Sequence, residues 1–179
     1  MDLKVDNLFI NIEKNEKGML EPCLKFIDFG SAHHGLHSVT DASTSPYRPP
    51  EALTEHFPYD GERSDVFASA FVLLALYSLS RLSAGDSEHV QARSSHYEYF
   101  AQHGSVSKQY WKSCRVQEPS RELIELINGM LQEDPERRYG VKEILESKWM
   151  KSGEVPDEEE LHAFSVELLA HSSEYIPEF

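Results

Sequence analysis

The sequence predicts a mainly α-helical domain of the α+β kind, with one or two short β-hairpins near its N-terminal end. Residues 63–79 are apolar nearly all round, which is typical of a central buried helix. Apolar residues recur at intervals of three and four over 123–131, which predicts an amphipathic helix. Two short runs of β-forming residues, 8–12 and 23–27, flank a polar segment with Gly and Pro, and this pattern favours a hairpin with a long connection.

Caps and apolar stripes predict the remaining helices. Ser120 is placed to cap the helix that follows it. An apolar stripe over 141–149 predicts another helix, and short helices are expected near 97–102 and 108–112. The stretch 29–50 has little periodicity and many Ser, His, Gly and Pro residues, so we expect a long loop with a functional role.

An acidic tail follows residue 150, and we divide the chain into a domain over 1–150 and a tail over 151–179. Asp157 followed by Glu160 forms a capping-box pattern, which predicts a final helix over about 157–170. Three apolar residues form a stripe along this helix: Leu161, Phe164 and Leu168. We expect the stripe to dock on the helices of the domain and the acidic residues to form a solvated face.

The composition narrows the classes of function. With 179 residues, 40% of them hydrophobic, the chain can build one cored domain. Its net charge of −14 makes it a poor match for nucleic acid or an anionic membrane surface. The start lacks a signal-peptide pattern, the longest apolar run is too short to span a bilayer, and nothing around Cys23 and Cys114 marks a secreted disulfide framework. We therefore expect a cytoplasmic protein, with the nucleus as the alternative, whose acidic charge suits a basic or Mg²⁺-bridged partner.

The first chemical motif is Asp-Leu-Lys-x-x-Asn over residues 2–7. Phosphoryl transfer to a hydroxyl needs a carboxylate that accepts the proton, a cation near the transferred phosphate, and oxygen ligands for Mg²⁺. Asp2, Lys4 and Asn7 can supply all three groups from one turn of the chain. The motif is short, and a solvated chain end is the alternative interpretation when it is taken alone.

Three more motifs follow along the chain. Asp28-Phe29-Gly30 ends the second β-forming run, where Asp28 can present a carboxylate to Mg²⁺ and Gly30 allows a sharp backbone turn. In Tyr47–Glu51 two prolines fix the backbone before what looks like a helix start, and Asp134–Arg138 directly follows a helix.

In this order and at these intervals, the motifs resemble those of the protein kinase family. The residues from Asp2 match the catalytic loop H-R-D-L-K-x-x-N, and Asp28–Gly30 match D-F-G. Pro49-Pro50-Glu51 resembles the family's A-P-E, and Asp134–Arg138 its D-P-x-x-R. The resemblance covers residues 1–150 and implies the helical C-terminal lobe of the kinase-like fold.

The resemblance implies a role for each matching residue. Asp2 would be the catalytic base, Lys4 would contact the transferred phosphate, and Asn7 and Asp28 would hold the Mg²⁺ that accompanies ATP. Thr44 stands where the family has a Thr that contacts the catalytic Asp and Lys. Lys4 together with Thr44 is the serine/threonine pattern rather than the tyrosine pattern.

Other matching positions have structural or regulatory roles. Glu51 would form a buried ion pair with Arg138, and Asp65 would hold the backbone of the catalytic loop. The activation segment, residues 28–51, contains three candidate phosphorylation sites: Ser38, Thr40 and Ser43. The activation segment also contains His33, His34 and His37, which suggest a metal site. No further ligand stands at a supporting spacing, so a solvated loop is favoured.

By resemblance, the chain is a piece of a serine/threonine protein kinase that uses ATP and Mg²⁺ and phosphorylates proteins. The sequence does not contain the family's Gly-rich loop, strand Lys and helix Glu, which cover and orient the ATP phosphates. We therefore expect this chain alone to be inactive, and to take an N-terminal lobe or a regulatory protein as its partner. The alternative function is an inactive kinase lobe that serves as a protein-binding module.

Overall fold

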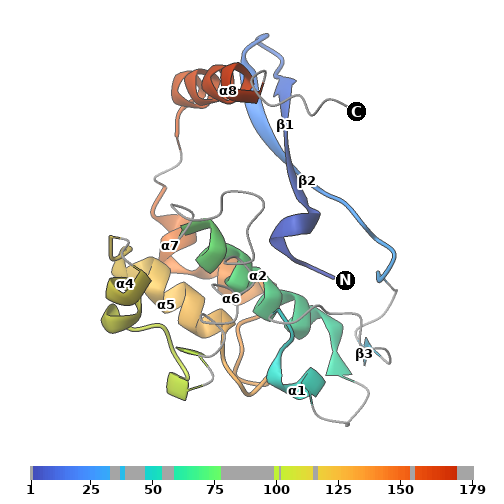
Figure 1. Cartoon of the computed structure of the whole chain (residues 1–179), viewed down its shortest axis with the longest axis vertical. Coiled ribbons are helices and arrows are strands. Elements are labelled where there is room, and N and C mark those ends of the chain that lie inside the picture. The colour runs from blue at the N-terminus through green and yellow to red at the C-terminus, as the bar shows by residue number, and fades with distance from the viewer. Residues whose placement is uncertain are drawn as a thin grey trace. The chain divides into compact units, whose positions relative to one another are not determined.

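The computed structural model shows two compact units (Figure 1). The residues that it describes are 2–32, 37–38, 47–53, 59–77, 99–100, 102–114, 117–153 and 156–172. The helical unit comprises Met1–Val5 and Asp28–Ser152, and the hairpin unit comprises Asp6–Ile27 and Gly153–Phe179. The division of the chain after residue 150 stays a prediction.

Helices dominate the helical unit, which confirms the mainly α-helical fold class. Its described helices are α1 (Pro50–Leu53), α2 (Gly61–Tyr77), α4 (Lys108–Cys114), α5 (Arg121–Met130), α6 (Val141–Glu146) and α7 (Lys148–Lys151). The short strands β3 (His37–Ser38) and β4 (Tyr59–Asp60) pair antiparallel. The helix expected near 97–102 lies partly outside the described residues.

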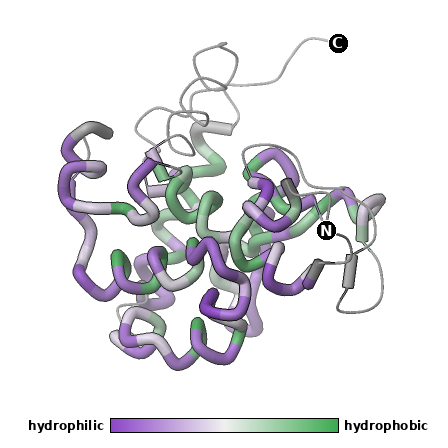
Figure 2. The backbone as a smooth tube through the Cα atoms, turned by 90° about the horizontal axis from the view of Figure 1, so that it is seen from below, coloured by the Kyte–Doolittle hydropathy of each residue, from purple (hydrophilic) through white to green (hydrophobic). Residues whose placement is uncertain are grey.

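The core of the helical unit forms around α2, which is apolar nearly all round as predicted. Phe67, Ala70 and Leu74 are fully buried on successive turns. The ring of Phe67 lies 5.3 Å from that of Phe71 and 5.8 Å from that of Phe100. In Figure 2 green apolar stretches of the backbone alternate with purple hydrophilic ones. The aromatic cluster holds α2 in place, and α2 in turn supports the residues of the candidate site.

Serine caps determine where α5 and α7 begin. The Ser120 hydroxyl accepts a hydrogen bond of 3.2 Å from a backbone N–H in the first turn of α5, which confirms the predicted cap. The prediction of one helix over 141–149 is wrong, because α6 ends at Glu146 and the extended residue Ser147 caps α7 through the N–H of Met150. A serine hydroxyl competes for backbone N–H groups, and apolar periodicity does not reveal this competition.

A glycine in α5 makes room for an aromatic ring. A Cβ atom on Gly129 would lie 2.4 Å from Cε2 of Tyr139, which is closer than real Cβ atoms approach. We expect Gly129→Ala to lower the free energy of unfolding by about 1–3 kcal/mol, even though alanine favours a helix by about 1 kcal/mol. Urea denaturation followed by circular dichroism measures the loss. In a Tyr139→Ala background the substitution should be neutral or stabilising, and an equal cost in both backgrounds would contradict this packing.

The hairpin unit joins a β-hairpin to the last described helix. The 3-10 helix η1 (Val5–Asn7) leads into strand β1 (Leu8–Lys14), which pairs antiparallel with β2 (Leu20–Phe26). The register runs from Leu8 opposite Phe26 to Lys14 opposite Leu20. The predicted hairpin is therefore confirmed, and its strands reach closer to the turn than the β-forming runs alone indicate.

Helix α8 (Glu158–Ser172) begins at the predicted capping box. The N–H of Asp157 donates to Glu160 Oε2 at 3.0 Å, and the N–H of Glu160 donates to Asp157 Oδ1 at 2.9 Å. Helix α8 packs against β2 of the same unit. The expected docking of its apolar stripe on the helices of the domain stays a prediction. Ser165 is fully buried, Leu161 and Leu168 on the same helix face are partly buried, and Phe164 is 47% exposed, so two of the three predicted residues lie on the buried face. The long hairpin offers a strand surface that the pattern of α8 cannot reveal by itself.

An ion pair joins the two strands of the hairpin. Lys25 Nζ lies 2.9 Å from Glu13 Oε1, and the Asn11 side chain donates to the same oxygen at 2.9 Å. These hydrogen bonds, from Lys25 first and Asn11 second, hold the pKa of Glu13 below its ordinary value. Because the folded-state pKa is lowered, the pair contributes stability above the unfolded-state pKa and loses it as the pH falls through the folded-state pKa.

We expect an NMR titration of the Glu13 carboxyl group to show this lowered pKa directly. Lys25→Met should raise the pKa of Glu13, because it removes the first of the two donors. Lys14→Met, which removes a charge from the same hairpin, is the matched control and should leave the value unchanged. Identical titration curves for the unchanged protein and Lys25→Met would rule out the contact.

Candidate active site

Two of the predicted catalytic residues lie in contact. Lys4 Nζ donates to Asp2 Oδ2 at 2.6 Å, and Asp2 is only 9% exposed. A charge-assisted hydrogen bond of this length holds the carboxylate in one orientation. The predicted base and the predicted phosphate-binding cation therefore lie together in the helical unit.

Tyr47, to which the sequence assigned no role, links the predicted catalytic loop to the activation segment. The N–H of Val5 donates to the hydroxyl of Tyr47 at 3.5 Å, and Tyr47 is 2% exposed. The Tyr47 ring packs edge-on against Phe71 of α2, with 6.5 Å between the ring centres. Its position directly before the Arg-Pro-Pro-Glu sequence could have suggested a role for Tyr47. The sequence does not show, however, which backbone N–H donates to its hydroxyl.

Asp28 carries the backbone turn that we expected at Gly30. Its φ angle is 60°, in the left-handed region that few residues other than glycine adopt. Asp28 Oδ1 accepts a hydrogen bond of 3.2 Å from the N–H of Gly30, and this local bond stabilises the turn. The side chain of Asp28 is exposed, and the neighbouring Phe29 is 60% exposed.

Asn7 belongs to the hairpin unit, where it is 8% exposed. Its carbonyl oxygen accepts a hydrogen bond of 3.0 Å from the N–H of Ile27, which closes the base of the hairpin. Thr44, Thr40, Ser43, His33 and His34 lie outside the described residues, as do the side chains of Ser38 and His37. Within the described residues, no group of three or more His, Cys, Asp or Glu side chains is arranged to hold a metal ion.

Arg138 and Glu51 form the predicted buried ion pair. The Arg138 side chain is fully buried, and its Nη1 and Nη2 atoms donate to the two carboxylate oxygens of Glu51 at 2.5 and 2.8 Å. The remaining N–H groups donate to the backbone carbonyls of Arg63, Gln132 and Glu133. The guanidinium carbon lies 4.9 Å from the centre of the Phe67 ring. All five donors are thus used, and the pair ties α1 to the chain after α5.

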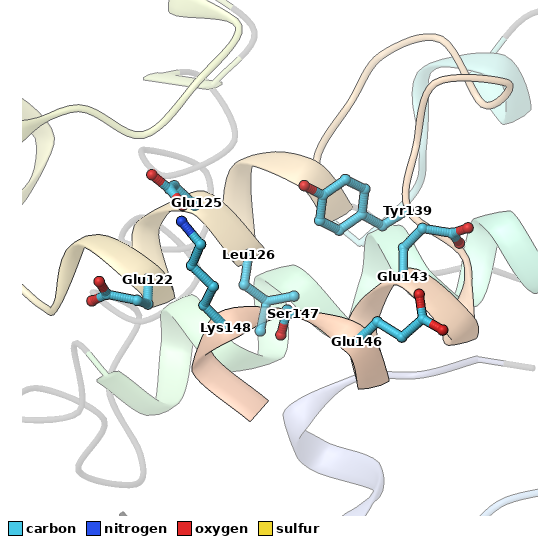
Figure 3. Close-up of a pocket in the computed structure, with 8 residues that line it drawn as sticks. All are labelled: Glu122, Glu125, Leu126, Tyr139, Glu143, Glu146, Ser147 and Lys148. Atoms are coloured by element: carbon cyan, nitrogen blue, oxygen red, sulfur yellow. The ribbon is translucent and has the colours of Figure 1, made fainter. Parts of the chain in front are cut away.

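A separate pocket of about 310 Å³ opens between α5, α6 and α7 (Figure 3). It is lined by Glu122, Glu125, Leu126, Tyr139, Glu143, Glu146, Ser147 and Lys148. Positive groups offset its carboxylates, since Arg121 pairs with Glu125 at 2.8 Å and Lys148 is part of the lining. Backbone N–H groups, its own and that of Gly140, lower the pKa of Glu143. Asp2, Lys4, Asn7 and Asp28, the predicted catalytic and Mg²⁺-binding residues that the structure describes, do not line this pocket.

Comparisons with known proteins agree with the fold and the motifs. The family model described as "Protein kinase domain" matches residues 1–150. The chain is 30% identical to "CBL-interacting protein kinase 25" of Oryza sativa subsp. japonica, over 85% of this chain and 26% of that protein. It is 26% identical to "Serine/threonine-protein kinase chk1" of Schizosaccharomyces pombe, over 84% and 28%, and 31% identical to "Maternal embryonic leucine zipper kinase" of Danio rerio, over 85% and 20%.

The chain therefore belongs to the protein kinase family. It spans between about a fifth and somewhat more than a quarter of the length of these relatives. Among the described residues, no helix has the length and apolar character needed to cross a membrane.

Proposed function

We propose that this chain contributes the catalytic loop of a serine/threonine protein kinase, which transfers the γ-phosphate of MgATP to Ser or Thr hydroxyls of proteins. The observation that carries the proposal is the contact of 2.6 Å between Asp2 and Lys4. Both residues lie within the match to the protein kinase family. A buried carboxylate beside a cation suits phosphoryl transfer to a hydroxyl, which needs a proton acceptor and a positive charge near the phosphate. The similarity to a serine/threonine-protein kinase of Schizosaccharomyces pombe supports this choice of acceptor.

In the proposed reaction the substrate hydroxyl oxygen attacks the γ-phosphorus as the bond to the β,γ-bridging oxygen breaks. Asp2 orients the hydroxyl and accepts its proton, and Lys4 stabilises the negative charge on the transferred group. Thr44 is proposed to contact both residues. ADP leaves with the electron pair of the broken bond, so the charges balance without any other reactant.

Asn7 and Asp28 are the proposed ligands of Mg²⁺. An amide oxygen and a carboxylate are hard oxygen donors of the kind that Mg²⁺ prefers, and the Asp28 side chain is exposed. Bound Mg²⁺ would neutralise charge on the ATP phosphates. The family covers and orients ATP with a Gly-rich loop, a strand Lys and a helix Glu, and these groups lie in none of the four motifs. We therefore propose an N-terminal lobe or a regulatory protein as the partner that supplies them. A cytoplasmic or nuclear location, where MgATP and protein substrates meet, completes the proposal.

An inactive protein-binding module is the second candidate function. Large apolar side chains on the hairpin favour it, because Phe9, Ile10 and Leu24 are each more than half exposed. Exposed apolar groups gathered on one element are typical of a protein contact surface. The two candidates differ in whether MgATP binds.

A thermal-shift titration with MgATP separates the two functions. At a ligand concentration of 100 times Kd, binding should raise Tm by about 5–10 °C in the unchanged chain. Asp28→Asn should abolish the shift, because it removes the carboxylate that holds Mg²⁺, and Glu16→Gln in the exposed hairpin turn is the matched control. A control that shifts while Asp28→Asn does not supports the enzyme, whereas no shift even in the longest natural product that contains this chain supports the binding module.

A further inference from the structure

Helix α8 is fastened to the hairpin by a histidine that acts as a hydrogen-bond acceptor. The N–H of Leu20, at the first residue of β2, donates to Nδ1 of His162 at 2.9 Å. A backbone N–H can only donate, so Nδ1 of His162 must carry no proton in this arrangement. The contact therefore requires a neutral imidazole ring.

Protonation of His162 turns an attractive contact into a repulsive one. A proton taken from water onto Nδ1 removes the acceptor and places two N–H groups opposite each other. The Leu20 N–H then loses its partner in a partly buried position. Since the released state binds one proton more than the fastened state, the attachment weakens as the pH falls.

Other charged groups lie around the contact, on both the hairpin and α8. Lys17 in the hairpin turn donates to both carboxylate oxygens of Glu158, at 2.8 and 2.7 Å. Glu158 and Glu159 precede His162 by one helical turn on α8. On the hairpin, Lys14 is the register partner of Leu20, and Glu21 follows it on β2.

We propose that His162 is a pH-sensitive latch that holds α8 against β2 when neutral and releases it when protonated. Both side chains of the Lys17–Glu158 ion pair are exposed, and exposed ion pairs contribute little to stability. This pair is therefore a weak second attachment of α8. Ser165 on α8 is fully buried in the fastened state. Release therefore uncovers the part of β2 that α8 contacts.

Amide hydrogen exchange on the whole chain tests the latch. Protection factors, which are already corrected for the intrinsic effect of pH on exchange, should fall about tenfold for Leu20 and for the buried face of α8 between about pH 7.5 and about pH 5.5. His162→Asn is the decisive variant, because an asparagine oxygen can accept near the position of Nδ1 but does not titrate. It should remove the pH dependence, whereas His162→Ala should show low protection at every pH.

Two controls keep the test specific to His162. Lys17→Met should lower protection slightly at every pH and leave the pH dependence intact, because it removes only the second attachment. An ¹⁵N NMR spectrum at neutral pH reports directly which ring nitrogen of His162 carries the proton. A protonated Nδ1 at that pH, or the same pH dependence in His162→Asn as in the unchanged chain, overturns the proposal, and neither readout depends on kinase activity.

Discussion

Asp2→Asn is expected to lower kcat for phosphorylation of a serine peptide by about 10²- to 10⁴-fold, the range that a lost general base produces. Asparagine has nearly the same shape as aspartate, and its side-chain oxygen can still accept the hydrogen bond that Lys4 donates to Asp2 at 2.6 Å. The fold and the binding of MgATP should therefore persist. Since the carboxylate acts on the reacting hydroxyl, KM for ATP should change little while kcat falls.

The assay for Asp2→Asn belongs on the longest natural product that contains this chain. Glu62→Gln, an exposed carboxylate in the first turn of α2, is the matched control and should retain full activity. A variant that keeps normal kcat would remove Asp2 from the chemistry. A variant that loses MgATP binding together with kcat would instead show that Asp2 acts in building the site.

Arg138→Met is expected to lower the free energy of unfolding by about 3–5 kcal/mol, which is the cost of breaking a buried ion pair by removing one partner. Methionine fills part of the space but leaves Glu51, whose side chain is 16% exposed, without its bidentate partner. Three backbone carbonyls also lose their donors. Chemical denaturation in guanidinium chloride measures the effect.

Two further variants show whether the loss comes from the stranded carboxylate. Arg138→Lys keeps the charge but has no planar fork to serve five acceptors, so it should recover only part of the stability. Glu51→Leu combined with Arg138→Met should be less harmful than Arg138→Met alone, because a buried pair can be exchanged for apolar groups at small cost. A double variant as unstable as the sum of the two single ones would contradict this account.

Local patterns predicted the elements of this fold that depend on neighbours in the sequence. The apolar surface of α2, the Ser120 cap and the box formed by Asp157 and Glu160 are all set within one or two helical turns. The pairing of Glu51 with Arg138 lies beyond such reach, since the residues are 87 positions apart, and it was predicted only from the resemblance to a family. Periodicity alone cannot join two distant charges.

Features that depend on particular hydrogen-bond partners could not be predicted from the sequence. The left-handed conformation of Asp28 depends on its own side chain bonding to Gly30, where a glycine is the simpler expectation. The contact of Tyr47 with the Val5 N–H needs the activation segment to return to the catalytic loop. The roles of Asp2, Lys4, Asn7, Asp28 and Thr44 stay predictions, because they concern bound ATP and substrate rather than the folded chain.

The attachment of α8 to the hairpin also has a consequence for how this protein is made. Leu20 and His162 are 142 residues apart, so the hairpin leaves the ribosome long before the helix that covers it. At roughly 5–20 residues per second, that interval lasts about 7 to 30 seconds. During this time the β2 strand is without its cover, which is when a chaperone has the best opportunity to bind it.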